Sequence, residues 1–389
     1  MCIRDSQGKT YHTGRWPKEP VDFTGLRVGV MGTGSSGIQA IPQLAKQAKE
    51  LYVFQRTPNF SVPAWNGPID PVHQQDWLAN YPKYREQARN TRSGIMYEYG
   101  TQSAVEMSDE ARAEEMERRW RKGGTNFAHS FNDTFTNRQS NELLSEFVRG
   151  KIRQMVKDPA IAQKLLPHDH GIGTKRICVD TGYYQTYNLP HVKLIDLRST
   201  PIERFDAQAA ITREGRYEVD AMVFATGYDA VTGALERLNL IGEQGKTFQQ
   251  LWHSGPTSYL GLMTVGFPNL FTITGPGSPS ILTNVIVSIE QHVDWIADCL
   301  AHMDRHGHTR IEAQQSAQDQ WVKHVQEVAN GTLFVTANSW YMGANIPGKP
   351  RVFLPYIGGF STYAAHCQEV VKKGYEGFDF SRPQAVAGH

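Results

Sequence analysis

Three glycines near the start of the chain have the spacing of a phosphate-binding turn. An apolar run, residues 26–31, leads into the sequence Gly32, Thr33, Gly34, Ser35, Ser36 and Gly37. A strand that turns through glycines into a helix lets the backbone approach a pyrophosphate, and the free N–H groups of the helix N-terminus then point at the phosphates. Glycine-rich turns are common, so this pattern needs support from the residues around it.

The residues after the glycines complete a βαβ pattern. An amphipathic helix is predicted over residues 38–47 and a second strand over residues 51–54. Arg56 lies 19 residues after Gly37, where a unit selective for NAD usually carries an acid. A guanidinium binds a ribose 2′-phosphate, so the sequence predicts an NADP site. The alternative, a solvated arginine at the end of a strand, stays open.

Composition and charge argue against several classes of function. With 389 residues, 40% of them hydrophobic, the chain can bury a large core and is expected to form two or three domains. A formal net charge of +1 gives no reason to expect nucleic acid or an anionic membrane as a partner. No apolar stretch approaches about 18 residues, and no signal-peptide pattern opens the sequence. We therefore expect a cytoplasmic protein.

The cysteines and histidines do not have the spacing of metal ligands. The four cysteines are widely separated and form no CxxC pair, which fits a reduced protein without a disulfide framework or a zinc site: Cys2, Cys178, Cys299 and Cys367. The histidines, among them His168, His170 and His292, likewise show no metal-like spacing and are left unassigned. We expect no metal.

The rest of the chain divides into a polar helical stretch and a second region that contains strands. Helices are predicted over residues 106–121 and 141–155 within the charge-dense stretch that ends near residue 157. Strands are then predicted at 191–197, 217–225 and 269–274, followed by a helix at 284–303.

A second set of motifs is specific enough to indicate a family. Gly8, His12, Trp16 and Pro17 precede the glycine turn at spacings of four, four and one. Further motifs follow in order, at residues 173–176 (GTKR), 180–184 (DTGYY), 224–229 (FATGYD), 275–280 (GPGSPS), 288–292 (SIEQH) and 339–350. Together they resemble the Baeyer-Villiger monooxygenases, most of all the branch that oxidises phenylacetone. The sequence departs from the family at Ser6, where the fingerprint has Phe, and residues 1–7 do not look like family sequence.

This resemblance implies an α/β fold, that of a two-dinucleotide-binding, Rossmann-like flavoprotein with a helical insert. It implies FAD and NADP(H) as cofactors, and a small-molecule ketone and O2 as substrates, and it leaves the oligomeric state open. Family members carry a FAD-binding glycine motif before the fingerprint, and this sequence has one such motif. We therefore expect the N-terminal part of the FAD-binding domain to be absent, and this chain to be the C-terminal two-thirds to three-quarters of a longer enzyme.

The resemblance also implies a division into domains. Residues 1–24 are expected to form a fingerprint linker, and residues 25–60 with 174–225 an NADP-binding Rossmann-like domain. Residues 61–173 are expected to form the helical insert, and residues 226–389 the C-terminal part of the FAD-binding domain.

The family chemistry can be carried over to individual residues. In the family NADPH reduces FAD, O2 adds to the reduced flavin, and the flavin peroxide inserts one oxygen atom beside the ketone carbonyl to give an ester or a lactone. Arg176, in the GTKR motif, matches the catalytic arginine whose fixed charge stabilises the peroxide anion. The cofactor-binding residues implied besides Arg56 and the glycine turn are Thr57, Lys175, Asn284 and Trp340. His12 belongs to the fingerprint, and the resemblance implies a structural or domain-motion role for it.

Two other functions remain as alternatives. The chain resembles flavin monooxygenases that oxygenate nitrogen or sulfur, although these usually lack the Trp16-Pro17 pair. A catalytically silent NADP-binding fragment is the second alternative, since half of the flavin site is expected to be absent.

Overall fold

The computed structural model describes residues 6–382, which divide into two units. The first unit contains the described residues up to Gly67 together with Glu98–Tyr228, and the second contains Pro68–Tyr97 together with the described residues from Asp229 onward. Residues 68–97 thus belong to the second unit, which differs from the single insert predicted over residues 61–173.

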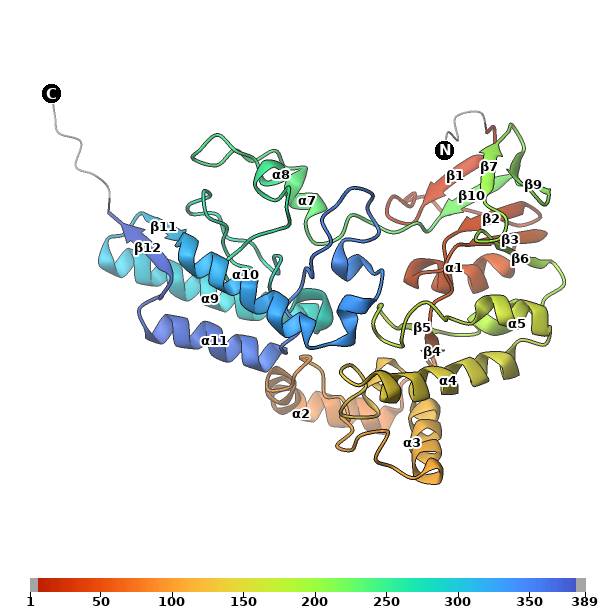
Figure 1. Cartoon of the computed structure of the whole chain (residues 1–389), viewed down its shortest axis with the longest axis horizontal. Helices are drawn as coiled ribbons and strands as arrows, with labels where there is room; N and C mark the ends of the chain where they lie inside the picture. The colour runs from red at the N-terminus through yellow and green to blue at the C-terminus, as the bar shows by residue number, and fades with distance from the viewer. Residues whose placement is uncertain (1–5, 383–389) are drawn as a thin grey trace. The chain divides into compact units, whose positions relative to one another are not determined.

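A five-stranded parallel sheet forms the centre of the first unit (Figure 1). In spatial order its strands are β1 (Lys9–His12), β10 (Ala221–Phe224), β2 (Arg27–Met31), β3 (Glu50–Gln55) and β6 (Val192–Asp196). The parallel α/β architecture expected from the sequence is confirmed. Strand β1 lies within the predicted fingerprint linker and pairs with β10 as an edge strand of this sheet.

Both faces of the sheet are covered, and the side chains of β3 alternate between them. Leu51 and Val53 pack into a core with helix α1 (Ser35–Ala45), whose Ile38 and Ile41 are fully buried. Tyr52 and Phe54 point to the other face, which the antiparallel strands β7 (Ile202–Phe205), β8 (Ala209–Thr212) and β9 (Arg216–Glu218) cover. A parallel sheet buried on both faces explains the nearly continuous apolar run of this strand.

The prediction of a single strand over residues 217–225 was wrong, because this region forms two strands, β9 and β10. The chain instead leaves the small antiparallel sheet at Glu218 and enters the parallel sheet at Ala221. Asp220 marks the change of sheet: its Oδ2 atom accepts hydrogen bonds from the backbone N and the Nε atom of Arg27, at 2.8 and 3.1 Å. Only Val219 and Asp220 separate the two strands, so in the sequence they look like one strand.

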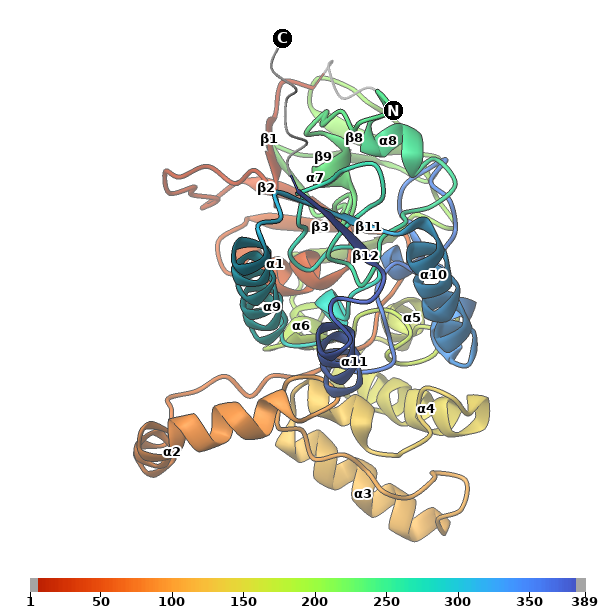
Figure 2. The same ribbon diagram turned by 90° about the vertical axis from the view of Figure 1, so that its left-hand side faces the viewer.

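The helices of the first unit pack against this core. Their bounds are α3 (Asp109–Lys122), η1 (Thr125–His129), α4 (Arg138–Met155), α5 (Pro159–Leu165) and α6 (Tyr183–Thr186), and the short strands β4 (Ser61–Pro63) and β5 (Cys178–Asp180) pair in parallel. Helices α3 and α4 lie side by side (Figure 2), and Lys151 of α4 forms an ion pair with Glu117 of α3 at 2.6 Å. Leu144, Val148 and Ile152 of α4 are fully buried, as the helical spacing predicted.

Three long helices enclose the core of the second unit (Figure 1). They are α9 (Val285–His306), α10 (Gln315–Asn330) and α11 (Phe360–Lys372), which contribute Trp295, Trp321 and Tyr363 to that core. The remaining elements are α2 (Pro71–Arg89), α7 (Gly233–Glu236), α8 (Phe248–Leu251), η2 (Ser280–Leu282), η3 (Leu333–Thr336), η4 (Trp340–Met342) and the antiparallel pair β11 (Arg310–Ala313) and β12 (Phe378–Ser381). Within residues 6–382, no helix is long and apolar enough to cross a membrane.

The strand predicted over residues 269–274 is absent, and this prediction was wrong. Asn269 and Thr274 have positive φ angles of 59° and 54°, so the segment turns at both ends. The side chain of Asn269 accepts a hydrogen bond from the backbone N of Ile311 at 2.9 Å and donates one to the carbonyl of Thr309 at 3.0 Å. The segment therefore makes loop contacts instead of a sheet ladder.

His292 is fully buried in the core of the second unit and is held in its neutral form. Its Nδ1 atom accepts a hydrogen bond from the backbone N of Thr274 at 3.0 Å. Its Nε2 atom lies 2.9 Å from the hydroxyl of Tyr363, which itself donates to the carbonyl of Leu260 at 2.5 Å. Because Nδ1 accepts a hydrogen bond and Tyr363 donates its proton to Leu260, the single N–H proton of the His292 imidazole lies on Nε2. Burial lowers the pKa of His292 to about 4.

We expect this histidine to make the second unit sensitive to acid. Between pH of about 6.5 and about 4 the unfolded chain binds a proton at this position and the folded chain does not, so the free energy of unfolding should fall as the pH falls. The shift corresponds to about 3 kcal/mol. Urea unfolding at several pH values would measure it. His292→Gln should flatten this slope, whereas His73→Gln on the exposed face of α2 should retain it. An unchanged slope in His292→Gln would assign the effect to another group.

Candidate cofactor site

The glycine turn between β2 and α1 requires glycine at two of its positions. Gly32 has a φ angle of 105°, which disfavours a side chain. A Cβ atom on Gly37 would lie 2.1 Å from the carbonyl oxygen of Gly32, so the first turn of the helix packs directly on the preceding loop. Gly34 differs, because a Cβ atom built there meets nothing within 4 Å. Gly34 therefore borders open space at the end of the sheet.

The N-terminus of α1 fits a bound phosphate group. Gly34 is its N-cap residue, no side chain caps the helix, and its first turn contains no acid. The first N–H groups of a helix have no partner within the helix, and they carry its positive partial charge. The open space beside Gly34 and these donors together suit a dinucleotide pyrophosphate.

Arg56 and Thr57 leave the sheet at the same edge as the glycine turn. Strand β3 ends at Gln55, so Arg56 is the next residue, and its side chain is exposed. The hydroxyl of Thr33 in the glycine turn donates to the carbonyl of Thr57 at 2.9 Å, which ties the two loops together. Parallel strands end at one edge of their sheet, which explains why residues more than 20 positions apart meet there.

Helix α4 holds the segment that leads into Lys175 and Arg176. The amide of Asn141 donates to the carbonyl of Ile172 at 2.9 Å, and the hydroxyl of Ser145 accepts from the backbone N of Ile172 at 3.0 Å. Gly173 has a φ angle of 78°, and a Cβ atom on it would lie 2.5 Å from the ring of Phe135. The GTKR motif therefore begins at a position that only glycine fits.

A partly exposed carboxylate lies at the centre of the basic residues in this region. Asp169 accepts a hydrogen bond from Nδ1 of His170 at 2.7 Å, and its other oxygen lies 3.4 Å from Nζ of Lys175. Burial alone would raise the pKa of Asp169, but the hydrogen bond from His170 and the charges of Lys175 and Arg198 hold it well below its usual range. Burial lowers the pKa of His170 and that of Lys175. Asp169 is thus ionised, and His170 is neutral at pH 7.

Arg176 is exposed, lies two residues before β5 and belongs to the same unit as the glycine turn. Two residues later, Cys178 connects the elements: its sulfur lies 3.3 Å from the hydroxyl of Ser35 in α1 and accepts from the amide of Asn59 at 3.4 Å. Burial raises the pKa of Cys178 to about 11, so its thiol is inert. The contact between Cys178 and Ser35 places the backbone that carries Arg176 close to the N-terminus of α1.

The fingerprint residues of the first unit form a strand and a turn. Gly8 precedes β1, where a Cβ atom would lie 3.2 Å from the carbonyl oxygen of Asp220. Nδ1 of His12 accepts a hydrogen bond from the backbone N of Gly14 at 3.0 Å, a contact that shapes the turn. Trp16 is 42% exposed and its ring lies 5.5 Å from that of Tyr11. Pro17 is exposed and follows directly. These contacts fit a structural role.

Two of the residues predicted to bind cofactor lie in the second unit. Asn284 is the N-cap of α9 and accepts from the backbone N of Ile286 at 3.2 Å. Trp340 is half-buried and begins the short helix η4. The loop that carries Trp340 is anchored by an ion pair between Lys349 and Asp229, the last residue of the FATGYD motif.

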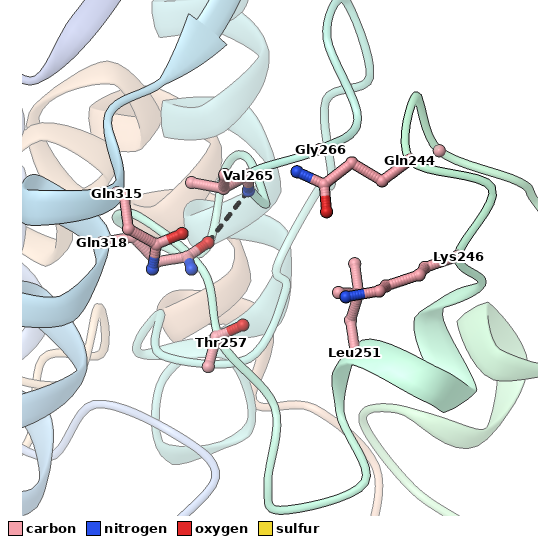
Figure 3. Close-up of a pocket in the computed structure, with 9 residues that line it drawn as sticks. Gln244, Lys246, Leu251, Thr257, Val265, Gly266, Gln315 and Gln318 are labelled. Carbon is pink, nitrogen blue, oxygen red and sulfur yellow. Dashed lines mark hydrogen bonds between the residues drawn. The ribbon is translucent and has the colours of Figure 1, made fainter.

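A cavity of about 230 Å³ lies elsewhere in the second unit (Figure 3). Gln318 lines one side, where its Oε1 atom accepts from the backbone N of Val265 at 2.9 Å, and Lys246 lies on the opposite side. None of the residues predicted from the sequence lines this cavity, and we assign it no part in the chemistry. Among the described residues, no group of three His, Cys, Asp or Glu side chains could hold a metal ion.

Sequence reasoning missed Asp169 and Arg198, and it left His170 unassigned. Arg198 lies two residues beyond the end of β6, much as Arg56 lies one residue beyond β3. The position of Arg198 just after a predicted strand was the signal that could have identified it. That signal is informative only when the strand order is known, because β6 lies directly beside β3 in the sheet.

No protein-family model matches the chain, whereas curated proteins match it over almost its whole length. A Baeyer-Villiger monooxygenase from Pseudooceanicola batsensis is 39% identical over 376 residues, which cover 96% of this chain and 68% of that protein. Cyclohexanone 1,2-monooxygenase from Acinetobacter sp. is 38% identical, covering 97% of this chain and 69% of that protein. Phenazine N-monooxygenase from Lysobacter antibioticus is also 38% identical, covering 96% and 68%.

Solved structures are similar as well. A steroid monooxygenase bound to NADP has a TM-score of 0.92 and 45% identity, and the match covers 98% of this chain and 72% of that one. The structure of OTEMO in complex with FAD and NADP has a TM-score of 0.94 and 37% identity, covering 97% and 72%.

Two glycine substitutions should separate the stability of the turn from its binding function. Gly37→Ala should lower the free energy of unfolding by about 1–3 kcal/mol, because the added methyl group meets the carbonyl of Gly32. Gly34→Ala should destabilise the chain less and should weaken NADPH binding, because its methyl group enters the space where a pyrophosphate would lie. Urea unfolding and a fluorescence titration with NADPH measure the two effects. Unimpaired NADPH binding by Gly34→Ala would contradict the placement of the pyrophosphate.

Proposed function

The chain belongs to the Baeyer-Villiger monooxygenase family, and we propose that its first unit binds NADPH for the insertion of one oxygen atom of O2 beside the carbonyl of a small-molecule ketone. The family is flavin- and NADP-dependent. When bound, FAD and NADPH supply the reducing equivalents and the activation of O2. The residues of this chain bind, orient and stabilise charge around that chemistry.

The observation that carries the proposal is the group of basic residues at the carboxyl edge of the parallel sheet. The glycine turn and the uncapped N-terminus of α1 would hold the pyrophosphate. Arg56, Lys175 and Thr57 would bind the 2′-phosphate, and the carbonyl of Thr57 accepts the hydrogen bond from Thr33 that ties this loop to the glycine turn. The positive charges of Lys175 and Arg56 are close enough to repel each other. An anion bound between them would relieve this repulsion and would therefore be stabilised.

We propose Arg176 as the catalytic residue. Its guanidinium would stabilise the negative charge that develops on oxygen during the insertion. The contacts from α4 to the segment before Gly173 fix the backbone from which this arginine extends. Trp340 and Asn284 are proposed to lie beside the bound cofactors. Asn284 would act by fixing the start of α9, since its side chain caps that helix.

The substrate is proposed to be a ketone, and the alternative is oxygenation of nitrogen. The GPGSPS loop followed by Ile281 and Leu282 resembles that of enzymes acting on aryl or linear ketones. A relative named phenazine N-monooxygenase is as similar to this chain as cyclohexanone monooxygenase is, so overall identity does not separate the two reactions. A screen of linear and aryl ketones against a phenazine substrate, with product analysis, would separate them.

A cytoplasmic location is part of the proposal. Cys178, Cys299 and Cys367 are buried free thiols, and Cys2 lies outside the described residues. Buried reduced cysteines and a requirement for NADPH both suit a reducing compartment.

Arg176→Ala should uncouple the reaction in the enzyme loaded with FAD. NADPH should still be oxidised, because cofactor binding does not depend on this charge, while formation of ester or lactone should fall by roughly 100-fold or more. Product formation by gas chromatography, set against NADPH consumption and release of hydrogen peroxide, measures the effect. Arg176→Lys, which keeps a positive charge, should recover part of the activity. Normal product yield from Arg176→Ala would refute the assignment.

The double variant Arg56→Ala/Lys175→Ala should lose most of its preference for NADPH over NADH. Each lost charge-assisted contact should cost about 1.5–3 kcal/mol, roughly one to two decades in affinity, and NADH makes neither contact. Equilibrium titration with the two cofactors is the measurement. Arg213→Ala/Lys157→Ala removes two exposed positive charges elsewhere in the unit and is the control. Equal losses for both cofactors would rule out the 2′-phosphate assignment.

A further inference from the structure

Arg198 is a third positive residue at the edge of the sheet where Arg56 lies. Gln55 at the end of β3 is in register with Asp196 at the end of β6, so the chain leaves both strands at the same level. The Nε atom of Arg198 donates to the backbone carbonyl of Arg56 at 2.7 Å. The side chain of Arg198 is 46% exposed, which leaves its terminal nitrogens accessible to a ligand.

Arg198 and Lys175 approach the same carboxylate from two sides. An Nη atom of Arg198 lies 4.0 Å from Oδ1 of Asp169, and Nζ of Lys175 lies 3.4 Å from Oδ2. His170 holds Asp169 in place through its 2.7 Å hydrogen bond. The basic side chains thus already face an anion that belongs to the chain.

The side chains around Asp169 carry a net positive charge, which attracts a phosphate monoester. Arg56, Lys175 and Arg198 carry three positive charges, Asp169 carries one negative charge, and burial keeps His170 neutral. Asp196 uses its Oδ1 atom to accept from the backbone N of Arg198 at 3.0 Å, so this oxygen is engaged at the turn. This hydrogen bond does not cancel the negative charge of Asp196, so three positive and two negative charges leave one net positive charge in the group, and a phosphate monoester carries about −1.5 to −2 at pH 7.

We propose that Arg198 is a further specificity-determining residue, which binds the 2′-phosphate of NADPH together with Arg56 and Lys175. This inference rests on the proposed NADPH site and deepens it. Asp169 keeps Lys175 and Arg198 oriented before the cofactor arrives. The Nη atom of Arg198 lies 4.0 Å from Oδ1 of Asp169, too far for a hydrogen bond, so it is available to bond the phosphate. A guanidinium presents paired donors that match a phosphate, which a single ammonium does not.

The simpler alternative is that Arg198 only supports the loop after β3 through the carbonyl of Arg56. In that case its removal would disturb Arg56 and would weaken adenosine binding whether or not a 2′-phosphate is present. Two small ligands separate these possibilities, because adenosine 2′,5′-bisphosphate and adenosine 5′-monophosphate differ by the 2′-phosphate alone.

The experiment is isothermal titration of the 389-residue chain with these two ligands. For Arg198→Ala we expect the affinity for adenosine 2′,5′-bisphosphate to fall about tenfold and that for the monophosphate to stay unchanged. Arg198→Gln, which keeps a donor without the charge, should show the same selective loss, and Arg198→Lys a smaller one. Arg213→Ala, an exposed arginine on the β8–β9 turn, should bind both ligands like the wild type, and thermal melts check that each variant is folded.

Each result decides between the two roles. Equal weakening of both ligands, or no weakening of either, in folded Arg198→Ala and Arg198→Gln would overturn the inference while leaving the NADPH site intact. A wild-type chain that binds the two ligands equally would instead refute the NADPH site itself, and with it the role of Arg198.

Discussion

The candidate site depends on the parallel pairing of β2, β3 and β6. Parallel strands end at one edge of a sheet, so the loops that follow them meet there although they are far apart in the sequence. Here that edge collects the glycine turn after β2, Arg56 after β3 and Arg198 after β6. The alternation of Leu51 and Val53 with Tyr52 and Phe54 fixes the register, because a shift by one residue would reverse the two buried faces.

Helix α4 shows how the inserted region serves the site. Its buried face packs on the core of the first unit, and two buried polar residues on that face, Asn141 and Ser145, bond the backbone of the segment before Gly173. Asp169 and His170 lie in that segment, and they orient Lys175. An ionised Asp169 keeps like charges close together before any ligand is present, which reduces the ordering that binding must impose.

The fold could be predicted from sequence where one local pattern was strong. The glycine turn, the apolar face of α1 and the run of β3 lie in one short stretch, and each of them was recognised. Prediction failed where the structure depends on distant partners. The apolar residues near Phe271 look like a strand, but Asn269 bonds to residues 309 and 311, about 40 positions away, and the segment turns instead. Likewise Asp220, bonded to Arg27, divides what looks like one strand into two.

The sequence by itself determined the chemistry that residues can perform and the family to which they belong. Ordered motifs such as GTKR and FATGYD, together with Arg56, were sufficient for this because each motif is contiguous. Only the tertiary structure decided which charges act together. Arg198, Asp169 and Lys175 are separated by loops of different length, and their meeting depends on strand order and on contacts from α4. Side-chain charge is a property of the residue, whereas the electrostatic field at a site is a property of the distances between residues.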